Sequence, residues 1–102
     1  LSGGNQQKVA LGKWINMNAD IYIFNEPTRG IDIASKLEVY NIINTLVVQG
    51  KCIILISSEL MELATLSNRI VVMNKGQLVK EIDKTKISMS EQGIAKVILE
   101  DI

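Results

Sequence analysis

The chain has 102 residues, of which 47 % are hydrophobic, and its 11 basic residues balance its 11 acidic residues to a formal net charge of zero. Charges of both signs in no long blocks argue against a nucleic-acid or anionic-membrane partner, and an aromatic content of 4 % argues against a base-stacking surface. No apolar stretch approaches the roughly 18 residues of a membrane-spanning helix.

The single cysteine and the mean hydropathy indicate the compartment of the chain and whether it is a complete domain. One cysteine cannot build a disulfide framework, so Cys52, inside an apolar run, is predicted to be a buried thiol in a reducing compartment. The mean hydropathy of +0.21 is high for a free-standing domain of this size, and the first residue is not Met. We therefore expect a fragment whose apolar faces are covered by more chain.

The first stretch, Leu-Ser-Gly-Gly-Asn-Gln-Gln-Lys, precedes apolar residues on a helical repeat and predicts a helix from Ser2 to about Met17. The aligned peptide dipoles give a helix N-terminus partial positive charge, and its first N–H groups point outward. Gly3 and Gly4 carry no side chain, so a phosphate oxygen can approach the backbone while the Ser2 hydroxyl donates a further hydrogen bond. The stretch suits an anion site, although a capped helix behind a flexible glycine turn fits the same residues.

The next element is an apolar run, Ile21 to Phe24, which predicts a buried strand of a parallel sheet. Asn25 and Glu26 follow it, at the end of the strand where open α/β sheets bind ligands. In a phosphate-hydrolysing site Asn25 would help to hold a magnesium ion through its water shell, and the Glu26 carboxylate would orient or deprotonate the attacking water. The alternative is a strand end with two solvated polar residues.

The rest of the chain alternates strands and helices. Asp32 is expected to be an N-cap or first-turn acid of a helix that stops at Gly50, and Ser58 is expected to cap a later, short helix. The tripeptide Asn-Lys-Gly between two β-rich runs indicates a hairpin. The further predicted elements are strands at Cys52 to Ile56, Arg69 to Met73 and Gln77 to Ile82, the short helix after Ser58 with an apolar face of Leu60, Leu63, Ala64 and Leu66, and a last helix at about Glu91 to Leu99. This alternation predicts an α/β fold with a mainly parallel sheet, one antiparallel hairpin and flanking helices.

The motifs are more specific in combination than alone. Leu-Ser-Gly-Gly with its helix, then an apolar strand ending in Asn-Glu-Pro-Thr and a Gly-x-Asp turn, resemble the signature motif, Walker B strand and D-loop of ABC-type ATPases. The longer strings LSGGNQQKV, EPTRGID and ISSEL look like the second nucleotide-binding domain of the double-domain ATPase subunits that drive bacterial import of ribose, xylose and galactosides. The resemblance runs from Leu1 to about Ile98. It implies that residues 1–102 are the C-terminal part of one nucleotide-binding domain, with a truncated P-loop NTPase core.

The resemblance also implies a role for each matching residue. In this family two nucleotide-binding domains clamp two ATP molecules, and each ATP lies between the phosphate loop of one domain and the signature helix of the other. Glu26 is implied to be the catalytic base, and Asn25 a weak magnesium contact through water. The residues implied to contact nucleotide are Ser2, Gly3, Gly4 and Asn5 at the partner's ATP, Ser58 at this domain's own ATP, and Asp32 at the interface.

Three residues depart from the usual family pattern. Asn25 replaces an Asp, and its neutral amide gives up the charge that a hard cation favours but can still accept a hydrogen bond from a metal-bound water. Ser58 replaces a His that senses the γ-phosphate, and serine reaches less far and carries no proton at neutral pH. Asn5 stands where many relatives carry Gln. Ser58 and Asn5 are both typical of the sugar-import group.

The phosphate loop itself does not occur in the sequence. There is no G-x-x-x-x-G-K-[ST] string, and the glutamine-containing loop that couples such domains to the permease is missing as well. The phosphate loop would supply the backbone cradle and the lysine for the β- and γ-phosphates. We therefore expect that this chain alone neither binds ATP tightly nor hydrolyses it.

The function implied by the resemblance is part of the energy-coupling ATPase subunit of a carbohydrate importer, with ATP and Mg²⁺, at the cytoplasmic face of the cell membrane. The implied partners are a second nucleotide-binding domain, transmembrane permease subunits and, indirectly, a periplasmic or extracellular sugar-binding protein. One alternative is a non-catalytic structural half of an asymmetric ABC ATPase pair, which Asn25 and Ser58 favour and Glu26 opposes. Another is a DNA-repair or chromosome-organising ATPase, against which the zero net charge argues. A free sheet edge and apolar faces lead us to expect self-association of the fragment.

Overall fold

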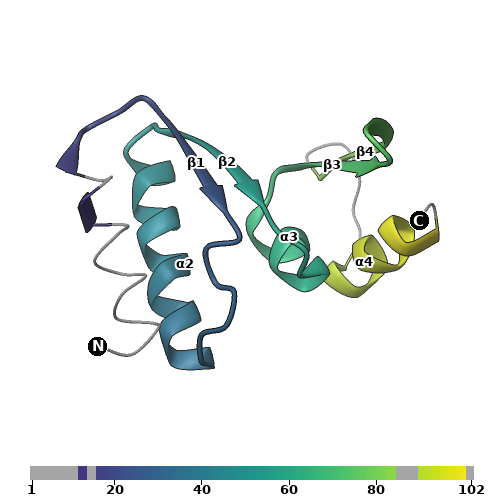
Figure 1. The fold of residues 1–102 in the computed structure, drawn as a ribbon, viewed down its shortest axis with the longest axis horizontal. Coiled ribbons are helices and arrows are strands. Elements are labelled where there is room, and N and C mark those ends of the chain that lie inside the picture. The colour runs from purple at the N-terminus through teal and green to yellow at the C-terminus, as the bar shows by residue number, and fades with distance from the viewer. Residues whose placement is uncertain (1–11, 14–15, 85–89, 101–102) are drawn as a thin grey trace. The chain divides into compact units, whose positions relative to one another are not determined.

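A computed structural model gives the fold of the chain and describes residues 12–13, 16–84 and 90–100. The chain divides into two compact units, the first covering Leu1–Ile56 and the second Ser57–Ile102. Each unit contains one pair of strands and at least one helix, as the labels in Figure 1 show. None of the helices in the described ranges is long and apolar enough to span a membrane.

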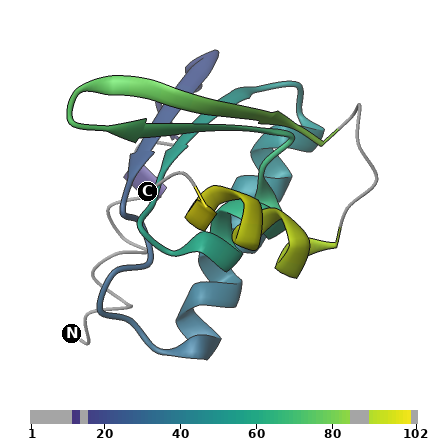
Figure 2. The ribbon, with the colours of Figure 1, turned by 90° about the vertical axis from the view of Figure 1, so that its right-hand side faces the viewer.

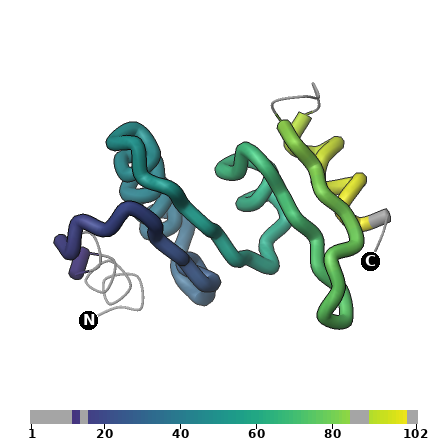
Figure 3. Tube along the Cα trace, turned by 90° about the horizontal axis from the view of Figure 1, so that it is seen from above, coloured from purple at the N-terminus to yellow at the C-terminus, as the bar shows by residue number. Residues whose placement is uncertain are grey.

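The first unit is a strand–helix–strand crossover. Strand β1 (Ile21–Asn25) and strand β2 (Cys52–Ile56) pair in parallel, in register from Ile21 opposite Cys52 to Asn25 opposite Ile56. Helix α2 (Ile33–Val48) joins them and lies alongside the strands in Figures 1 and 3. A parallel pair requires such a crossover because the chain must return to the same end of the sheet. The two strands and the helix predicted for these residues are confirmed.

Burial in this unit follows the periods of strand and helix. Tyr22 and Phe24 are buried and their rings stack with centroids 6.2 Å apart. The alternate residues Ile21 and Ile23 are 59 % and 65 % exposed, because side chains of a strand alternate between its two faces. The helix contributes three buried residues at helical spacing, Val39, Ile43 and Leu46. Within the described residues the sheet therefore has one covered face and one open face, so the strand predicted to be buried is buried on one face only.

The open face also explains the position of the cysteine. Cys52 is exposed, and its register partner is the exposed Ile21. Partner residues of a parallel pair point to the same side of the sheet, so Cys52 belongs to the open face. The prediction of a buried thiol is wrong. An apolar run marks a strand without showing which of its faces is covered.

The ends of α2 agree with the sequence prediction. Asp32 is the N-cap, and its side chain accepts a hydrogen bond from the Ser35 N–H at 2.8 Å. At the other end Gly50 takes a φ of +85°, a left-handed conformation that glycine adopts without a Cβ clash. These two residues fix the length of the crossover helix and so the start of β2.

Replacing Asp32 should measure the strength of this cap. We expect Asp32→Ala to lower the free energy of unfolding by about 1 kcal/mol, because the Ser35 N–H loses its only side-chain acceptor at a helix end. Asp32→Ser should keep most of the stability, since serine is an equally good N-cap. Urea unfolding of the two variants gives the comparison, and an unchanged free energy of unfolding in Asp32→Ala would show that the cap contributes nothing.

The second unit packs two helices against a hairpin. It contains α3 (Leu60–Leu66), β3 (Arg69–Asn74), β4 (Gln77–Asp83) and α4 (Glu91–Glu100). The strands pair antiparallel, and the turn residues Lys75 and Gly76 both have positive φ, 51° and 78°, as a two-residue hairpin turn of the right twist requires. Figure 2 shows α4 beside the hairpin. The hairpin and both helices predicted for this part of the chain are confirmed.

One hydrophobic cluster holds the second unit together. Its members come from α3, both strands and α4, and they are Ala64, Ile70, Val72, Ile82, Ile94 and Ile98. Burial of these side chains is the main force that keeps the short α3 and the ten-residue α4 folded, because isolated helices of such length are marginal in water.

Two lysines stabilise the C-terminal ends of both helices. Neither α3 nor α4 has a basic residue in its last turn. The Lys84 ammonium group donates to the Ala64 carbonyl of α3, and the Lys80 ammonium group donates to the Val97 carbonyl of α4 at 3.3 Å. Positive charge at a helix C-terminus complements the helix dipole and satisfies carbonyls that lack an intrahelical partner. Both helices therefore receive their C-terminal cations from β4 and the residue that follows it.

Candidate functional site

The carboxyl end of β1 carries the two predicted catalytic-site residues. Asn25 is exposed and Glu26 is half-buried. The Glu26 N–H donates to the Ile56 carbonyl at 2.7 Å, so its backbone is tied to the end of the neighbouring strand. Both side chains consequently stand at the edge of the parallel pair where open α/β sheets bind their ligands.

The Glu26 backbone has an unusual conformation. Its φ is +50°, in the left-handed region that few residues other than glycine, asparagine and aspartate adopt. Such a conformation costs free energy and persists where the surrounding structure enforces it, often at functional sites. Here the hydrogen bond to Ile56 on one side and the buried Pro27 on the other enforce it.

A hydrogen-bonded turn connects Glu26 to Asp32. The Arg29 N–H donates to the Glu26 carbonyl at 3.3 Å, and the Ile31 N–H donates to the Thr28 carbonyl at 3.5 Å. Thr28 is only 2 % exposed, so its side chain anchors the turn. The structure thus places Asn25, Glu26 and Asp32 on one continuous segment with both ends fixed, one by β2 and the other by α2.

Ser58 belongs to the second unit, and its predicted capping role is wrong. The N-cap of α3 is Glu59, because the helix begins at Leu60, one residue later than a Ser58 cap would require. The hydroxyl that serves this helix end comes from Ser57, which accepts a hydrogen bond from the Glu59 N–H at 3.0 Å and donates one to the Glu62 carboxylate. Ser58 itself is exposed between them.

Two polar residues were missed from the sequence, Ser57 and Glu62. Glu62 stands three residues after the N-cap Glu59, the spacing typical of a capping box, and this signal was available. The remaining predicted contacts, Ser2, Gly3, Gly4 and Asn5, lie outside the described residues, as does most of the helix predicted to follow them.

The oxygen groups of Asn25 and Glu26 suit a magnesium ion that is bound to nucleotide better than one that is held by protein side chains alone. Among the residues that the structure describes, no group of three or more His, Cys, Asp or Glu side chains could hold a metal. Magnesium usually keeps several waters and binds through substrate phosphates and one or two protein oxygens. The Asn25 amide and the Glu26 carboxylate are oxygen groups of that kind, so they suit contacts to a phosphate-bound ion through water.

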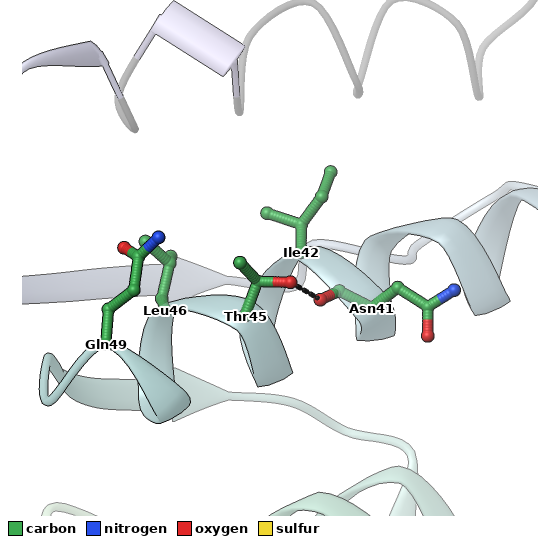
Figure 4. A pocket seen from close by; sticks show the side chains of 5 residues that line it. All are labelled: Asn41, Ile42, Thr45, Leu46 and Gln49. Atoms are coloured by element: carbon green, nitrogen blue, oxygen red, sulfur yellow. Dashed lines mark hydrogen bonds between the residues drawn. The ribbon is translucent and has the colours of Figure 1, made fainter.

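A shallow groove of about 190 Å³ lies along α2 and is a separate feature (Figure 4). The Thr45 hydroxyl, in its lining, donates to the Asn41 carbonyl of the same helix at 2.8 Å. None of its lining side chains ionises near neutral pH, so the groove offers no general acid or base. The lining residues are Asn41, Ile42, Thr45, Leu46 and Gln49.

Sequence comparison relates the chain to known proteins. No family model matches the chain. It is 49 % identical over 88 residues to the ribose import ATP-binding protein of Shouchella clausii, a match that covers 86 % of this chain and 18 % of that protein. It is 46 % identical over 98 residues to the xylose import ATP-binding protein of Thermoanaerobacter pseudethanolicus, covering 91 % of this chain and 19 % of that protein. The chain therefore spans less than a fifth of the length of these curated relatives.

A solved structure supports the fold. An ATP-binding cassette of an ABC transporter in its ADP conformation superposes with a TM-score of 0.78 over 98 % of this chain and 37 % of the cassette, at 23 % identity. The predicted α/β fold is confirmed as that of part of such a cassette. With about half of its residues identical to sugar-import proteins, the chain is homologous to a segment of the ATP-binding proteins of bacterial sugar importers and has the ABC ATPase fold.

Proposed function

We propose that this chain is part of the ATP-hydrolysing, energy-coupling subunit of a carbohydrate ABC importer. The observation that carries the proposal is Glu26, held in a left-handed conformation at the carboxyl end of the parallel strand pair. A carboxylate fixed at that edge can orient and deprotonate a water that attacks a phosphoryl group. The identity to ribose and xylose import ATP-binding proteins supports a sugar as the transported substrate.

Within that subunit the chain would be the C-terminal part of one nucleotide-binding domain, the second of two. Residues 1–102 would supply the signature motif to ATP held by the partner domain, and the Walker B strand and D-loop to ATP held by the phosphate loop of their own domain. Asp32 would lie near the interface between the two domains, beside the nucleotide. Ser58 would face the γ-phosphate of this domain's own ATP.

The chemistry at this site would be divided among a few oxygen and nitrogen groups. When bound with ATP, Mg²⁺ supplies positive charge that neutralises the β- and γ-phosphate oxygens. The Asn25 amide would hold a metal-bound water in place, and the Glu26 carboxylate would accept the proton of the attacking water. Because the sequence contains no phosphate-loop string, the chain alone should neither bind ATP tightly nor hydrolyse it.

The partners in this proposal are the second nucleotide-binding domain and the transmembrane permease subunits, with a sugar-binding protein acting through the permease. The subunit would work at the cytoplasmic face of the membrane and would be attached to it through the permease. Open apolar positions such as Ile23 and Ile54 suit burial against further protein, and self-association would cover them in the isolated chain.

A second candidate is a non-catalytic structural half of an asymmetric ABC ATPase pair. Asn25 and Ser58 support it, because an aspartate and a histidine at these positions would contribute a charge and a titratable group to hydrolysis. In this version the domain binds nucleotide mainly to hold the pair together. The signature residues would still serve the partner's ATP.

The proposed function is tested at the signature motif. We expect Ser2→Arg in the full-length subunit, reconstituted with its permease, to lower ATP hydrolysis at least about tenfold. The reason is that the long arginine side chain blocks the approach of the γ-phosphate to the N-terminus of the predicted signature helix. Asn44→Arg, which places the same side chain at an exposed position of α2, should leave hydrolysis unchanged. Full activity of Ser2→Arg would contradict the assignment of the signature.

A further inference from the structure

A hydrogen-bonded relay stands at the start of α3. The Ser57 hydroxyl accepts from the Glu59 N–H at 3.0 Å and donates to the Glu62 carboxylate. In a capping box the carboxylate of the third helical residue reaches the N-cap N–H directly. Here Glu59 is the N-cap and Glu62 the third helical residue, and the Ser57 hydroxyl stands between them. We call Ser57, Glu59 and Glu62 the Ser57 relay.

The relay is shielded from water. Glu62 is only 4 % exposed and Ser57 is half-buried. Hydrogen bonds to a carboxylate are stronger than those between neutral groups, and they gain further where the local dielectric is low. The position of the carboxylate in the first turn also complements the helix dipole. Burial and the charge of the carboxylate therefore both strengthen the Ser57–Glu62 hydrogen bond.

The start of α3 receives a side-chain acceptor from the Ser57 relay and none from its own N-cap residue. Glu59 makes no side-chain cap hydrogen bond, and glutamate is not among the preferred N-cap residues. The helix has seven residues and is too short to hold its own first turn by propagation. Loss of the Ser57 hydroxyl would remove the hydrogen bond that the Glu59 N–H donates to it and would loosen the turn.

Ser58 is the residue that this turn encloses. The hydrogen bond from the Glu59 N–H to the Ser57 oxygen spans Ser58 and closes an ST-turn around it. From this geometry we infer that Ser57 and Glu62 are positioning residues that hold Ser58 in the orientation required toward the nucleotide. The inference rests on the proposed function, in which Ser58 faces the γ-phosphate. It adds to that site two residues that touch neither nucleotide nor metal.

The experiment compares a hydroxyl with a methyl group at position 57 in the full-length subunit reconstituted with its permease. Thr and Val have nearly the same shape, so Ser57→Thr keeps the relay and Ser57→Val removes it. We expect Ser57→Val to lower kcat for ATP about tenfold with little change in KM, because small displacements of a catalytic-site group are costly to rate. Ser57→Thr should restore most of kcat. Ser57→Ala gives the same comparison with less added volume if Ser57→Val does not fold.

A second background separates positioning from helix stability. In a Ser58→Ala subunit, Ser57→Val should lower kcat no further, since the relay would act through a side chain that is already gone. An equal loss in both backgrounds, or full kcat in Ser57→Val, would overturn the inference. An unchanged kcat for Ser58→Ala alone would also overturn it, while a loss in Glu26→Gln would leave the proposed function standing. If Ser58→Ala and Glu26→Gln both keep full kcat, the proposed catalytic site and the relay's role fail together.

Discussion

Glu26→Gln should lower kcat for ATP hydrolysis by about 10²- to 10⁴-fold in the full-length subunit reconstituted with its permease, the range expected when a general base is removed. The KM for ATP should change little, because the amide keeps the size of the carboxylate and can still hydrogen bond to water. The substitution removes only the capacity to accept the proton of the attacking water. Steady-state phosphate release at saturating ATP measures the effect.

The position of Glu26 makes this substitution a clean test. The backbone is held by the hydrogen bond from its N–H to the Ile56 carbonyl and by the turn that follows, so glutamine should occupy the same place. Glu91→Gln is a matched control, since Glu91 is an exposed glutamate in the first turn of α4 and has no part in the site. It should retain full activity.

The result also decides between the two candidate functions. A large loss in Glu26→Gln means that this domain hydrolyses its own ATP despite Asn25 and Ser58. Full activity of Glu26→Gln together with loss in Ser2→Arg means that the chain serves only the partner's ATP. In that case the domain is the non-catalytic structural half of an asymmetric pair.

The sequence was sufficient to predict the order and type of the elements. The apolar runs that begin at Ile21 and Cys52 form a parallel strand pair. The Asn-Lys-Gly tripeptide contains the two residues of the hairpin turn, Lys75 and Gly76. Asp32 capped α2 as predicted. These are local features, in which hydrophobic period and turn chemistry act over a few neighbouring residues.

The errors concern properties that local patterns do not determine. An apolar strand has two faces, and its sequence does not show which is covered, so Cys52 was placed inside when it lies on the open face. A helix start is uncertain by a residue or two, and a shift of one residue moves the N-cap from Ser58 to Glu59. The contact of Lys84 with the Ala64 carbonyl joins residues twenty positions apart and depends on how the hairpin packs.

The candidate site was predicted in part. Asn25, Glu26 and Asp32 stand on the segment where the motif spacing put them, because a strand, a tight turn and a helix cap are each encoded locally. The Ser57 relay was not predicted. It combines a hydroxyl before the N-cap with a buried carboxylate after it, and the burial of Glu62 depends on the packing of the second unit.

That packing leads to a second large effect. Ile98→Ala should lower the free energy of unfolding of the second unit by about 2–5 kcal/mol, since it removes a side chain that is 2 % exposed from the cluster of α3, the hairpin and α4. The loss has two parts. Folding removes fewer apolar groups from water, and the missing side chain leaves a cavity in the cluster that contains Ile70, Ile82 and Ile94. Hydrogen exchange of the β3, β4 and α4 amides in the full-length protein reports this unit directly.

Leu99 supplies the matched control because it is the next residue on the same helix and is 57 % exposed. Leu99→Ala should change stability by no more than about 0.5 kcal/mol, as most surface substitutions do. Below its unfolding temperature Ile98→Ala should keep the kcat of the parent, because Ile98 belongs to the hydrophobic cluster of the second unit and has no proposed role in catalysis. Equal effects of Ile98→Ala and Leu99→Ala on hydrogen exchange would contradict the cluster as the core of this unit. A loss of kcat in Ile98→Ala that matches Ser57→Val would mean that general loosening of the second unit, and not the relay, controls Ser58.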